Sequence, residues 1–339
     1  MRILVTGGAG FIGSNLAHRF LAAGEEVTIF DNLSRLGTRK NLDWLKGDFG
    51  TRFEFMAGDV RDVDAVQQAV VGKDVVHHLA SQVAVTTSVK EPRYDFEVNA
   101  LGTLNVLEAA RRQAQKPIVV FTSTNKVYGS AEGVPVIERA TSYAYRDQPH
   151  GISESQPLDF HSPYACSKGA ADQYVRDYAR VYDLPTIVFR MSCIYGPRQF
   201  GTEDQGWVAH FIIAAVAGRP ITIYGNGKQV RDILFVDDLV GAFELAVENV
   251  DTTRGQVYNI GGGPQNAVSI WMEFYPILRG LLGHDLKVSY SDWRPGDQLV
   301  YISDTHKAQS DFGWKPTVSA TDGVACLIGW VTENRHLFV

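Results

Sequence analysis

Two residues spaced for one face of a helix could exchange a proton with an alcohol. Tyr164 and Lys168 lie four positions apart in a stretch that opens at Pro163, which suits the first turn of a helix. A phenol with a pKa of about 10 is a poor base at neutral pH, but a neighbouring ammonium group stabilises the phenolate. Such a pair alone is more often part of a solvated helix surface. A third group is therefore needed before the pair indicates catalysis.

Hydroxyl groups at a strand end supply that third member. Ser123 and Thr124 close the strand expected over 118–121, at the carboxyl edge where open α/β sheets place their ligands. A hydroxyl there can hydrogen-bond the reacting oxygen beside Tyr164. We predict Thr124, Tyr164 and Lys168 as the catalytic residues, with Ser123 as the second choice for the hydroxyl.

A glycine-rich turn near the start predicts a dinucleotide site. Gly7, Gly10 and Gly13 lie between a β-branched strand and a helical stretch, where glycines let the backbone approach a pyrophosphate. Asp31, at the end of the second strand, can accept hydrogen bonds from the adenosine ribose and would repel a 2′-phosphate. NAD is therefore expected rather than NADP. Arg35 weakens that preference, because an arginine can accommodate the phosphate.

The elements that must position these residues alternate along the first half of the chain. Helical patterns cover about 11–22, 92–112 and 162–182, and β-branched runs predict strands at 3–5, 27–30, 53–56, 75–79, 118–121 and 186–189. This order predicts an α/β fold with a Rossmann-type, doubly wound parallel sheet. Beyond Arg190 the rhythm breaks into Gly- and Pro-rich segments, which indicates a smaller C-terminal α/β lobe. We assign residues 1–190 and 229–262 to the dinucleotide-binding domain, and residues 191–228 and 263–339 to the substrate-binding lobe.

Composition narrows the function classes. The 339 residues carry a net charge of −6, so no broad basic surface indicates nucleic acid. Cys166, Cys193 and Cys326 lie far apart, which argues against a disulfide framework or a zinc site. No apolar run is long enough for a membrane span and no signal peptide fits, so we expect a cytoplasmic protein without a metal. The four histidines considered form no metal-ligand spacing and are expected to be structural: His77, His78, His150 and His161.

Taken together, the motifs resemble the extended short-chain dehydrogenases/reductases that modify nucleotide sugars, over essentially the whole chain. The resemblance rests on Gly7–Gly13, Asp31-Asn32, His78-Leu79-Ala80, Asn99, Ser123-Thr124 with Val127-Tyr128-Gly129, and Tyr164 with Lys168. Asp59 is expected near the adenine, although it is equally suited to cap a helix before Val63. The resemblance implies NAD contacts from Gly7, Gly10, Phe11, Ile12, Gly13, Asp31, Asn32, Ser34, Arg35, Asp59, Val60, Leu79, Ala80, Asn99, Tyr164 and Lys168.

Two later segments, 225–232 and 294–297, resemble that family's grips for a nucleotide diphosphate. Arg231 and Arg294 suit a pyrophosphate and Asp297 suits a ribose diol. Taken alone, each arginine would more often be a surface ion-pair partner.

The choice within the family depends on a few distinctive positions. Asn125 and Lys126 stand where 4,6-dehydratases carry an Asp-Glu pair, so the acid and base for water elimination are missing. Thr124 and Tyr164 are also forty residues apart, a longer gap than in most sugar 4-epimerases. These features resemble the family's 2-epimerases of CDP-sugars, which implies inversion at C2 of a CDP-hexose through a 2-keto sugar. The implied substrate contacts are Gln82, Thr86, Ser123, Asn125, Lys126, Cys193, Gly206, Trp207, Val208, Thr222, Tyr224, Arg231, Arg294 and Asp297.

Two alternatives stay open. One is a UDP-hexose 4-epimerase, and the other is a non-catalytic NAD(H)-binding sensor or scaffold, against which the intact catalytic trio speaks. Cys193 is more simply explained as a small buried hydrophobe. Apolar residues beyond the needs of one sheet face, Leu101, Leu104 and Val175, lead us to expect a homodimer or tetramer.

Overall fold

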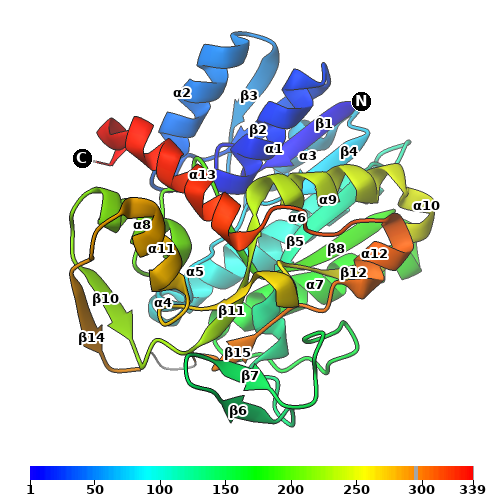
Figure 1. The fold of residues 1–339 in the computed structure, drawn as a ribbon. Helices are drawn as coiled ribbons and strands as arrows, with labels where there is room; N and C mark the ends of the chain where they lie inside the picture. The colour runs from blue at the N-terminus through cyan, green and yellow to red at the C-terminus, as the bar shows by residue number, and fades with distance from the viewer. Residues whose placement is uncertain (294–296, 339) are drawn as a thin grey trace.

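One parallel β-sheet forms the centre of the computed structural model, which describes residues 1–293 and 297–338 (Figure 1). The sheet has seven strands in the order β12-β8-β5-β4-β1-β2-β3, and every neighbouring pair is parallel. The strand order reverses between β1 and β4, and such a point opens a crevice at the carboxyl ends of the strands. The strands are β1 (Arg2–Thr6), β2 (Glu26–Asp31), β3 (Phe53–Ala57), β4 (Val75–His78), β5 (Ile118–Thr124), β8 (Thr186–Met191) and β12 (Gln256–Ile260). The predicted Rossmann-type fold is confirmed.

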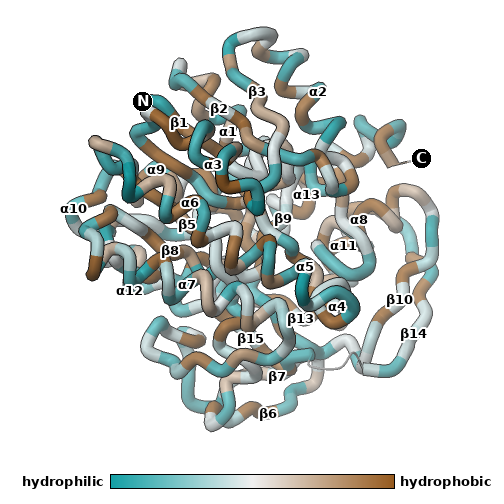
Figure 2. Tube along the Cα trace, turned by 180° about the vertical axis from the view of Figure 1, so that it is seen from behind, coloured by the Kyte–Doolittle hydropathy of each residue, from teal (hydrophilic) through white to brown (hydrophobic). Residues whose placement is uncertain are grey.

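Helices cover both faces of this sheet, which explains why its strands read as continuous apolar runs. On one face, buried side chains come from α1 (Phe11–Ala22), α2 (Thr38–Phe49), α9 (Val236–Glu248) and α12 (His306–Phe312). On the other face they come from α3 (Val63–Val70), α6 (Gly102–Arg111) and α7 (Pro163–Tyr182). Figure 2 shows hydrophobic residues gathered along the central strands and hydrophilic residues on the outer turns.

The helical stretch predicted over 92–112 is not uniform. It divides into α5 (Pro92–Phe96), a π-helical turn η1 (Glu97–Leu101) and α6, and the short helix α4 (Val85–Lys90) precedes it. π-Helical turns are rare and are frequent at functional sites. Here the turn carries Asn99, one of the predicted cofactor residues.

The second half of the chain builds a smaller lobe with its own apolar core. This lobe contains α8 (Trp207–Val216), β10 (Ile221–Tyr224), α11 (Phe274–Leu282), β14 (Val288–Ser291) and α13 (Ala320–Glu333). A small sheet lies between it and the main sheet, with β9 (Cys193–Tyr195), β11 (Val230–Phe235), β13 (Ala267–Ser269) and β15 (Val300–Tyr301). The segment 229–262, which we assigned to the dinucleotide-binding domain, is shared between the two sheets. Its strand β11 joins the small sheet, whereas α9 and β12 belong to the main sheet.

The remaining elements are short. The insertion between Thr124 and Tyr164 forms the hairpin β6 (Val136–Glu138) and β7 (Tyr143–Tyr145), visible at the bottom of Figure 1. Single turns are η2 (Asn125–Tyr128), α10 (Val250–Thr253), η3 (Pro264–Asn266) and η4 (Arg335–Leu337). Within the described residues, none of the helices has the length and apolarity that a membrane crossing requires.

Candidate active site

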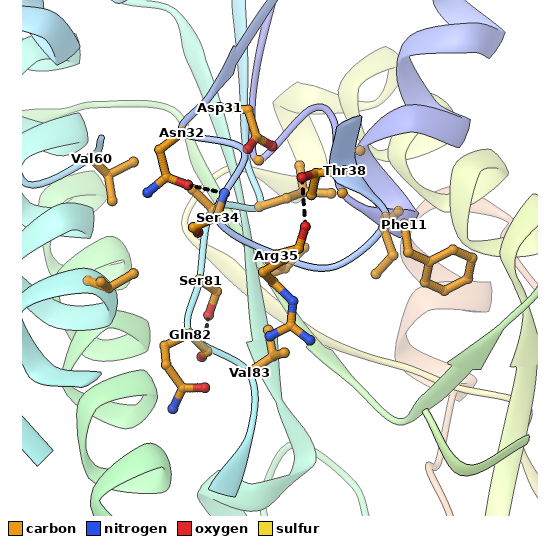
Figure 3. Close-up of a pocket in the computed structure, with 18 of the residues that line it drawn as sticks. Phe11, Asp31, Asn32, Ser34, Arg35, Thr38, Val60, Ser81, Gln82 and Val83 are labelled. Atoms are coloured by element: carbon orange, nitrogen blue, oxygen red, sulfur yellow. Dashed lines mark hydrogen bonds between the residues drawn. The ribbon is translucent and has the colours of Figure 1, made fainter. Parts of the chain in front are cut away.

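A cleft follows the carboxyl edge of the sheet, and the glycine turn forms one wall of it (Figure 3). A side chain on Gly7 would come within 2.7 Å of the Ala80 backbone nitrogen, and one on Gly13 would collide with the Gly7 carbonyl. Only glycine lets α1 begin this close to β1 and β4, which leaves an open backbone cradle that fits a pyrophosphate. All the predicted cofactor residues except Asn99 line this cleft.

Asp31 is held in place at the end of β2. Its carboxylate accepts hydrogen bonds from the backbone nitrogens of Ala9, at 3.0 Å, and Leu33, at 2.7 Å. Burial raises the pKa of Asp31, and these two hydrogen bonds oppose the rise. The Arg35 side chain runs away from Asp31 toward Val83, so its guanidinium does not face Asp31 (Figure 3). This arrangement favours NAD over NADP.

Replacing Asp31 by alanine is expected to weaken NAD binding about tenfold or more, the scale of a lost hydrogen bond to a charged group. The same change should narrow the difference in affinity between NAD and NADP, because the repelling carboxylate is gone. Fluorescence titration of both cofactors measures this, with Asp64→Ala, an exposed position on α3, as the control. An unchanged NAD-to-NADP ratio would show that Asp31 does not contact the ribose.

Asp59 lines the cleft but does not cap α3. It accepts a hydrogen bond from Asn32 at 2.9 Å and pairs with Arg61 at 2.9 Å, and Arg61 lowers the pKa of Asp59 to about 2. The cap is Asp62, which accepts from the first backbone nitrogens of the helix. The capping role considered for Asp59 is therefore wrong, because α3 begins at Val63 and the residue directly before it, Asp62, is its cap.

Two of the predicted catalytic residues, Tyr164 and Lys168, line the cleft, and Thr124 lies beside Tyr164. Ser162 caps α7 and Pro163 opens it, so Tyr164 and Lys168 lie on successive turns of the same face. Both side chains are buried, and the Thr124 hydroxyl at the end of β5 hydrogen-bonds the Tyr164 phenol. The helix and the strand thus place an alcohol-binding hydroxyl beside a potential acid or base.

In the protein by itself, burial controls the protonation of Tyr164 and Lys168. It raises the pKa of Tyr164 to about 12, and the hydrogen bond from Thr124 opposes that rise. Burial also lowers the pKa of Lys168 to about 7. The Lys168 amine donates to the Thr122 carbonyl and lies 4.2 Å from the centre of the Phe121 ring. The expected lowering of the Tyr164 pKa by Lys168 is not found: the groups that oppose desolvation of Tyr164 are Thr124 and Arg35.

The structure separates the two candidate hydroxyls. Ser123 donates to Asp172 at 2.8 Å, and Asp172 is held by Arg190 through two contacts of 2.9 Å. All three side chains are buried. The Ser123 hydroxyl is thus engaged with Asp172 although Ser123 lines the cleft, whereas Thr124 does not line the cleft but bonds the Tyr164 phenol. Sequence reasoning missed Asp172, although its position one turn after Lys168 was a usable signal.

A second polar network lies behind the cleft wall and contains Asn99. The amide nitrogen of Asn99 donates to the Gln82 backbone oxygen at 3.0 Å, and the amide oxygen of Asn99 accepts from the Gln82 backbone nitrogen at 2.9 Å. The Gln82 side chain donates to buried Asp95 at 2.8 Å, and Ser167 donates to the same carboxylate. Asn99 thus fixes the loop after β4, and its predicted contact with the cofactor stays a prediction. Asp95 was missed because nothing in its local sequence marks it.

The first turn of α4 differs from expectation. Thr86 is exposed and does not line the cleft, whereas its neighbour Thr87 does. In a short helix adjacent residues point about 100° apart, so the helix phase, which the sequence left open, decides which hydroxyl faces the ligand.

Charged side chains gather where the small lobe meets the catalytic residues. Arg231 on β11 pairs with Asp297 at 2.7 Å, and Lys126 donates to Gln298 at 3.2 Å. Lys126 interacts electrostatically with Arg231, Asp297 and Cys193. Arg294, predicted for the same site, lies outside the described residues.

The other predicted substrate residues divide between surface and core. Asn125 is buried beside Thr124, whose hydroxyl donates to it at 3.4 Å. Thr222 and Tyr224 are half-buried on β10, and Gly206 adopts a left-handed conformation at the start of α8. Trp207 packs edge-on against Phe274, Val208 is buried in the lobe core, and Cys193 packs against the same core.

Two of the four histidines are buried in the core, as expected for structural residues, and two are exposed, of which His161 shares a group with Asp159 and Glu132 whose potential ligand atoms lie within 4.8 Å of one another. His77 is buried between Phe20 and Phe243, and His78 bonds the hydroxyls of Thr6 and Thr103. His161 pairs with Asp159 at 2.8 Å on the surface, near Glu132. His150 contacts the ring of His306.

Comparison with known proteins agrees with this geometry. The family described as GDP-mannose 4,6 dehydratase matches residues 4–327. CDP-paratose 2-epimerase of Salmonella typhi is 45% identical over 98% of this chain and 100% of the relative, and UDP-glucose 4-epimerase of Mycolicibacterium smegmatis is 35% identical over 96% of each. A dTDP-glucose 4,6-dehydratase from Streptomyces venezuelae, solved with NAD bound, superposes with a TM-score of 0.85 at 32% identity, covering 99% of this chain and 98% of that one. The chain therefore belongs to the GDP-mannose 4,6-dehydratase family of extended short-chain dehydrogenases/reductases.

Proposed function

We propose that this chain is an NAD-dependent epimerase that inverts C2 of a CDP-hexose of the CDP-paratose and CDP-tyvelose type. The observation that carries the choice is its 45% identity with CDP-paratose 2-epimerase over the whole length of that relative. The site supports the redox part of the proposal, because Tyr164 and Lys168 line a cleft with a dinucleotide cradle and Thr124 lies beside Tyr164. We further propose a cytoplasmic location.

The residues at the site suit an oxidation followed by a reduction on the same carbon. Tyr164, as phenolate, accepts the proton of the C2 hydroxyl, and Thr124 donates a hydrogen bond to the same oxygen. Bound NAD supplies the acceptance and return of hydride at C2. The 2-keto sugar turns about its bond to the diphosphate while the nucleotide stays anchored, and Tyr164 then returns the proton. Lys168 stabilises the phenolate when its amine is protonated.

Water elimination is disfavoured by the residues after Thr124. Asn125 contributes an amide and Lys126 an amine, so neither offers the carboxylate that a dehydratase uses as acid or base. The proposed epimerisation therefore differs from the activity named for the 4,6-dehydratases that the chain resembles.

Exposed apolar side chains on two neighbouring helical stretches support an assembly. Phe96 and Leu101 are exposed on α5 and η1, and Tyr174 and Val181 are exposed on α7. We propose that this surface pairs two chains into a homodimer, alone or within a tetramer. Of the residues considered from the sequence, Val175 does not contribute, because it is buried in the chain's own core.

Isotope retention tests the reaction. C1 of the sugar is an acetal, so no carbonyl lies beside C2 and its hydrogen is not acidic. We therefore expect that a CDP-paratose deuterated at C2 gives a product with deuterium at C2, and that unlabelled substrate in deuterated water gives a product without it. Nuclear magnetic resonance of the product measures both, with no net consumption of NAD.

The other outcomes discriminate among the alternatives. Solvent deuterium at C2, or accumulation of one NADH for each product, would contradict the mechanism. Inversion at C4, or turnover of UDP- rather than CDP-hexoses, would support the 4-epimerase alternative. A chain that binds NAD but turns over no CDP-, GDP- or UDP-sugar would support the sensor or scaffold alternative.

A further inference from the structure

Lys126 lies two residues after Thr124, which carries the catalytic hydroxyl, and its side chain is half-buried. It lies in the η2 turn that Thr124 caps, and the Lys126 backbone nitrogen donates to the Thr124 hydroxyl oxygen at 3.2 Å. Its amine reaches across to the smaller lobe, where it donates to the side-chain oxygen of Gln298 at 3.2 Å. Lys126 therefore joins the end of β5 to the segment beside the charged pair of Arg231 and Asp297.

The charges around Lys126 are out of balance in favour of the cations. Arg231 and Lys126 share this region, and Asp297 is already paired with Arg231 at 2.7 Å. Among the described residues, no carboxylate lies within ion-pair distance of the Lys126 amine, which donates to the amide oxygen of Gln298. Burial and the nearby Arg231 lower the pKa of Lys126 to about 8. The neighbouring carboxylate of Asp232 is engaged with Ser192, Gly263 and Ser303, so the two cations are suited to an anionic ligand.

The chemistry of a 2-epimerase requires an anion at this place. C2 is bonded to C1, the carbon whose oxygen carries the diphosphate, whereas C4 lies on the opposite side of the ring. When C2 faces Thr124 and Tyr164, the sugar-linked phosphate must therefore lie close to those residues. When C4 faces them, that phosphate points away.

We propose that Lys126, with Arg231, binds the sugar-linked phosphate of the substrate and so directs C2 rather than C4 to Thr124 and Tyr164. The inference rests on the proposed function, since it explains how the same catalytic trio acts at a different carbon. It makes Lys126 a specificity-determining residue. Its position two residues after Thr124 couples the choice of carbon to the hydroxyl that binds the reacting oxygen.

The contact between Lys126 and the phosphate is tested by comparing nucleoside diphosphates with the corresponding monophosphates. Lys126→Met should weaken binding of CDP about tenfold to a hundredfold, the scale of a charge-assisted hydrogen bond, and leave CMP affinity within about twofold. Lys126→Arg should restore much of the CDP affinity. Calorimetric titration of the NAD-loaded protein measures these values, with UDP and UMP in parallel so that the result does not depend on the base.

A matched lysine controls for charge and burial. Lys73 is also largely buried and donates to the Thr28 hydroxyl at 2.7 Å, but it precedes β4 at the opposite edge of the sheet. Lys73→Met should leave the ratio of CDP to CMP affinity unchanged. Equal losses of CDP and CMP in Lys126→Met would show a structural role for its bond to Gln298, and unchanged affinity for both would show no contact with the phosphate. Either result would overturn the proposal.

The second measurement is the position of inversion in the product, C2 or C4. Wild-type protein is assayed first, and inversion at C2 establishes the proposed function independently of Lys126. Lys126→Met should then lower the rate of C2 inversion at saturating substrate and raise the share of product inverted at C4. Wild-type inversion at C4 would contradict the proposed function. Wild-type inversion at C2 together with an unchanged rate and product in Lys126→Met would contradict the role of Lys126 alone.

Discussion

Replacing Tyr164 by phenylalanine is expected to lower turnover by at least about 100-fold while NAD stays bound, because a positioned acid or base contributes a factor of this size. The phenol oxygen is the group that meets the Thr124 hydroxyl, and the substitution removes that oxygen alone. Lys168 and the glycine cradle stay in place, so the cofactor keeps its contacts. Product formation and NAD content, measured on the same preparation, separate the two effects.

A tyrosine outside α7 provides the control. Tyr290 is exposed on β14, 61% of its surface being accessible, and Tyr290→Phe should keep both turnover and NAD content. Turnover near that of the wild type in Tyr164→Phe would remove Tyr164 from the mechanism. Loss of NAD in parallel with activity would instead assign Tyr164 to cofactor binding.

Removal of the Asp172 carboxylate should cost the fold about 3–5 kcal/mol, the usual penalty when one partner of a buried ion pair is lost. Asp172 and Arg190 are both buried, and their paired contacts of 2.9 Å join α7 to β8. In Asp172→Ala the guanidinium of Arg190 would stay buried, and among the side chains that the structure describes it would keep a hydrogen bond only to the Tyr128 hydroxyl. Urea-induced unfolding followed by circular dichroism measures the change in the free energy of unfolding.

Two further variants separate charge from packing. Asp177→Ala, at an exposed position on α7, should change the free energy of unfolding by no more than about 0.5 kcal/mol. The double variant Asp172→Ala with Arg190→Met should recover part of the loss, because no unpaired charge then stays buried. A single variant as stable as the wild type would show that water compensates Arg190, contrary to the burial seen here.

Local sequence determined the elements and the motifs that need only local geometry. The helix predicted over 11–22 is α1, and the pattern over 162–182 is α7 within one residue. Glycine spacing, helical periodicity and a proline at the first turn act within a few residues, so they can be read without knowledge of distant contacts. The cofactor cleft followed from the same signals, since topology places the carboxyl ends of parallel strands at one edge.

Only the tertiary structure decided which polar groups are available at that edge. Ser123 and Thr124 are adjacent hydroxyls of the same strand, and a strand points neighbouring side chains to opposite sides. The partner of Ser123 is Asp172, 49 positions away, which engages one hydroxyl and leaves the other beside Tyr164. Such a pairing depends on how α7 packs on β5, and no local pattern encodes that contact.

The choice between Thr86 and Thr87 and the surroundings of Lys126 were also decided by tertiary packing. A short helix such as α4 takes its rotation from the elements it contacts, because its own few hydrogen bonds do not favour one phase. Lys126 meets Gln298 and Arg231 only because the chain crosses from the main sheet to the smaller lobe and back. Residue types therefore predicted the chemistry, whereas long-range packing, through burial and pairing of charges, determined which of those residues can perform it.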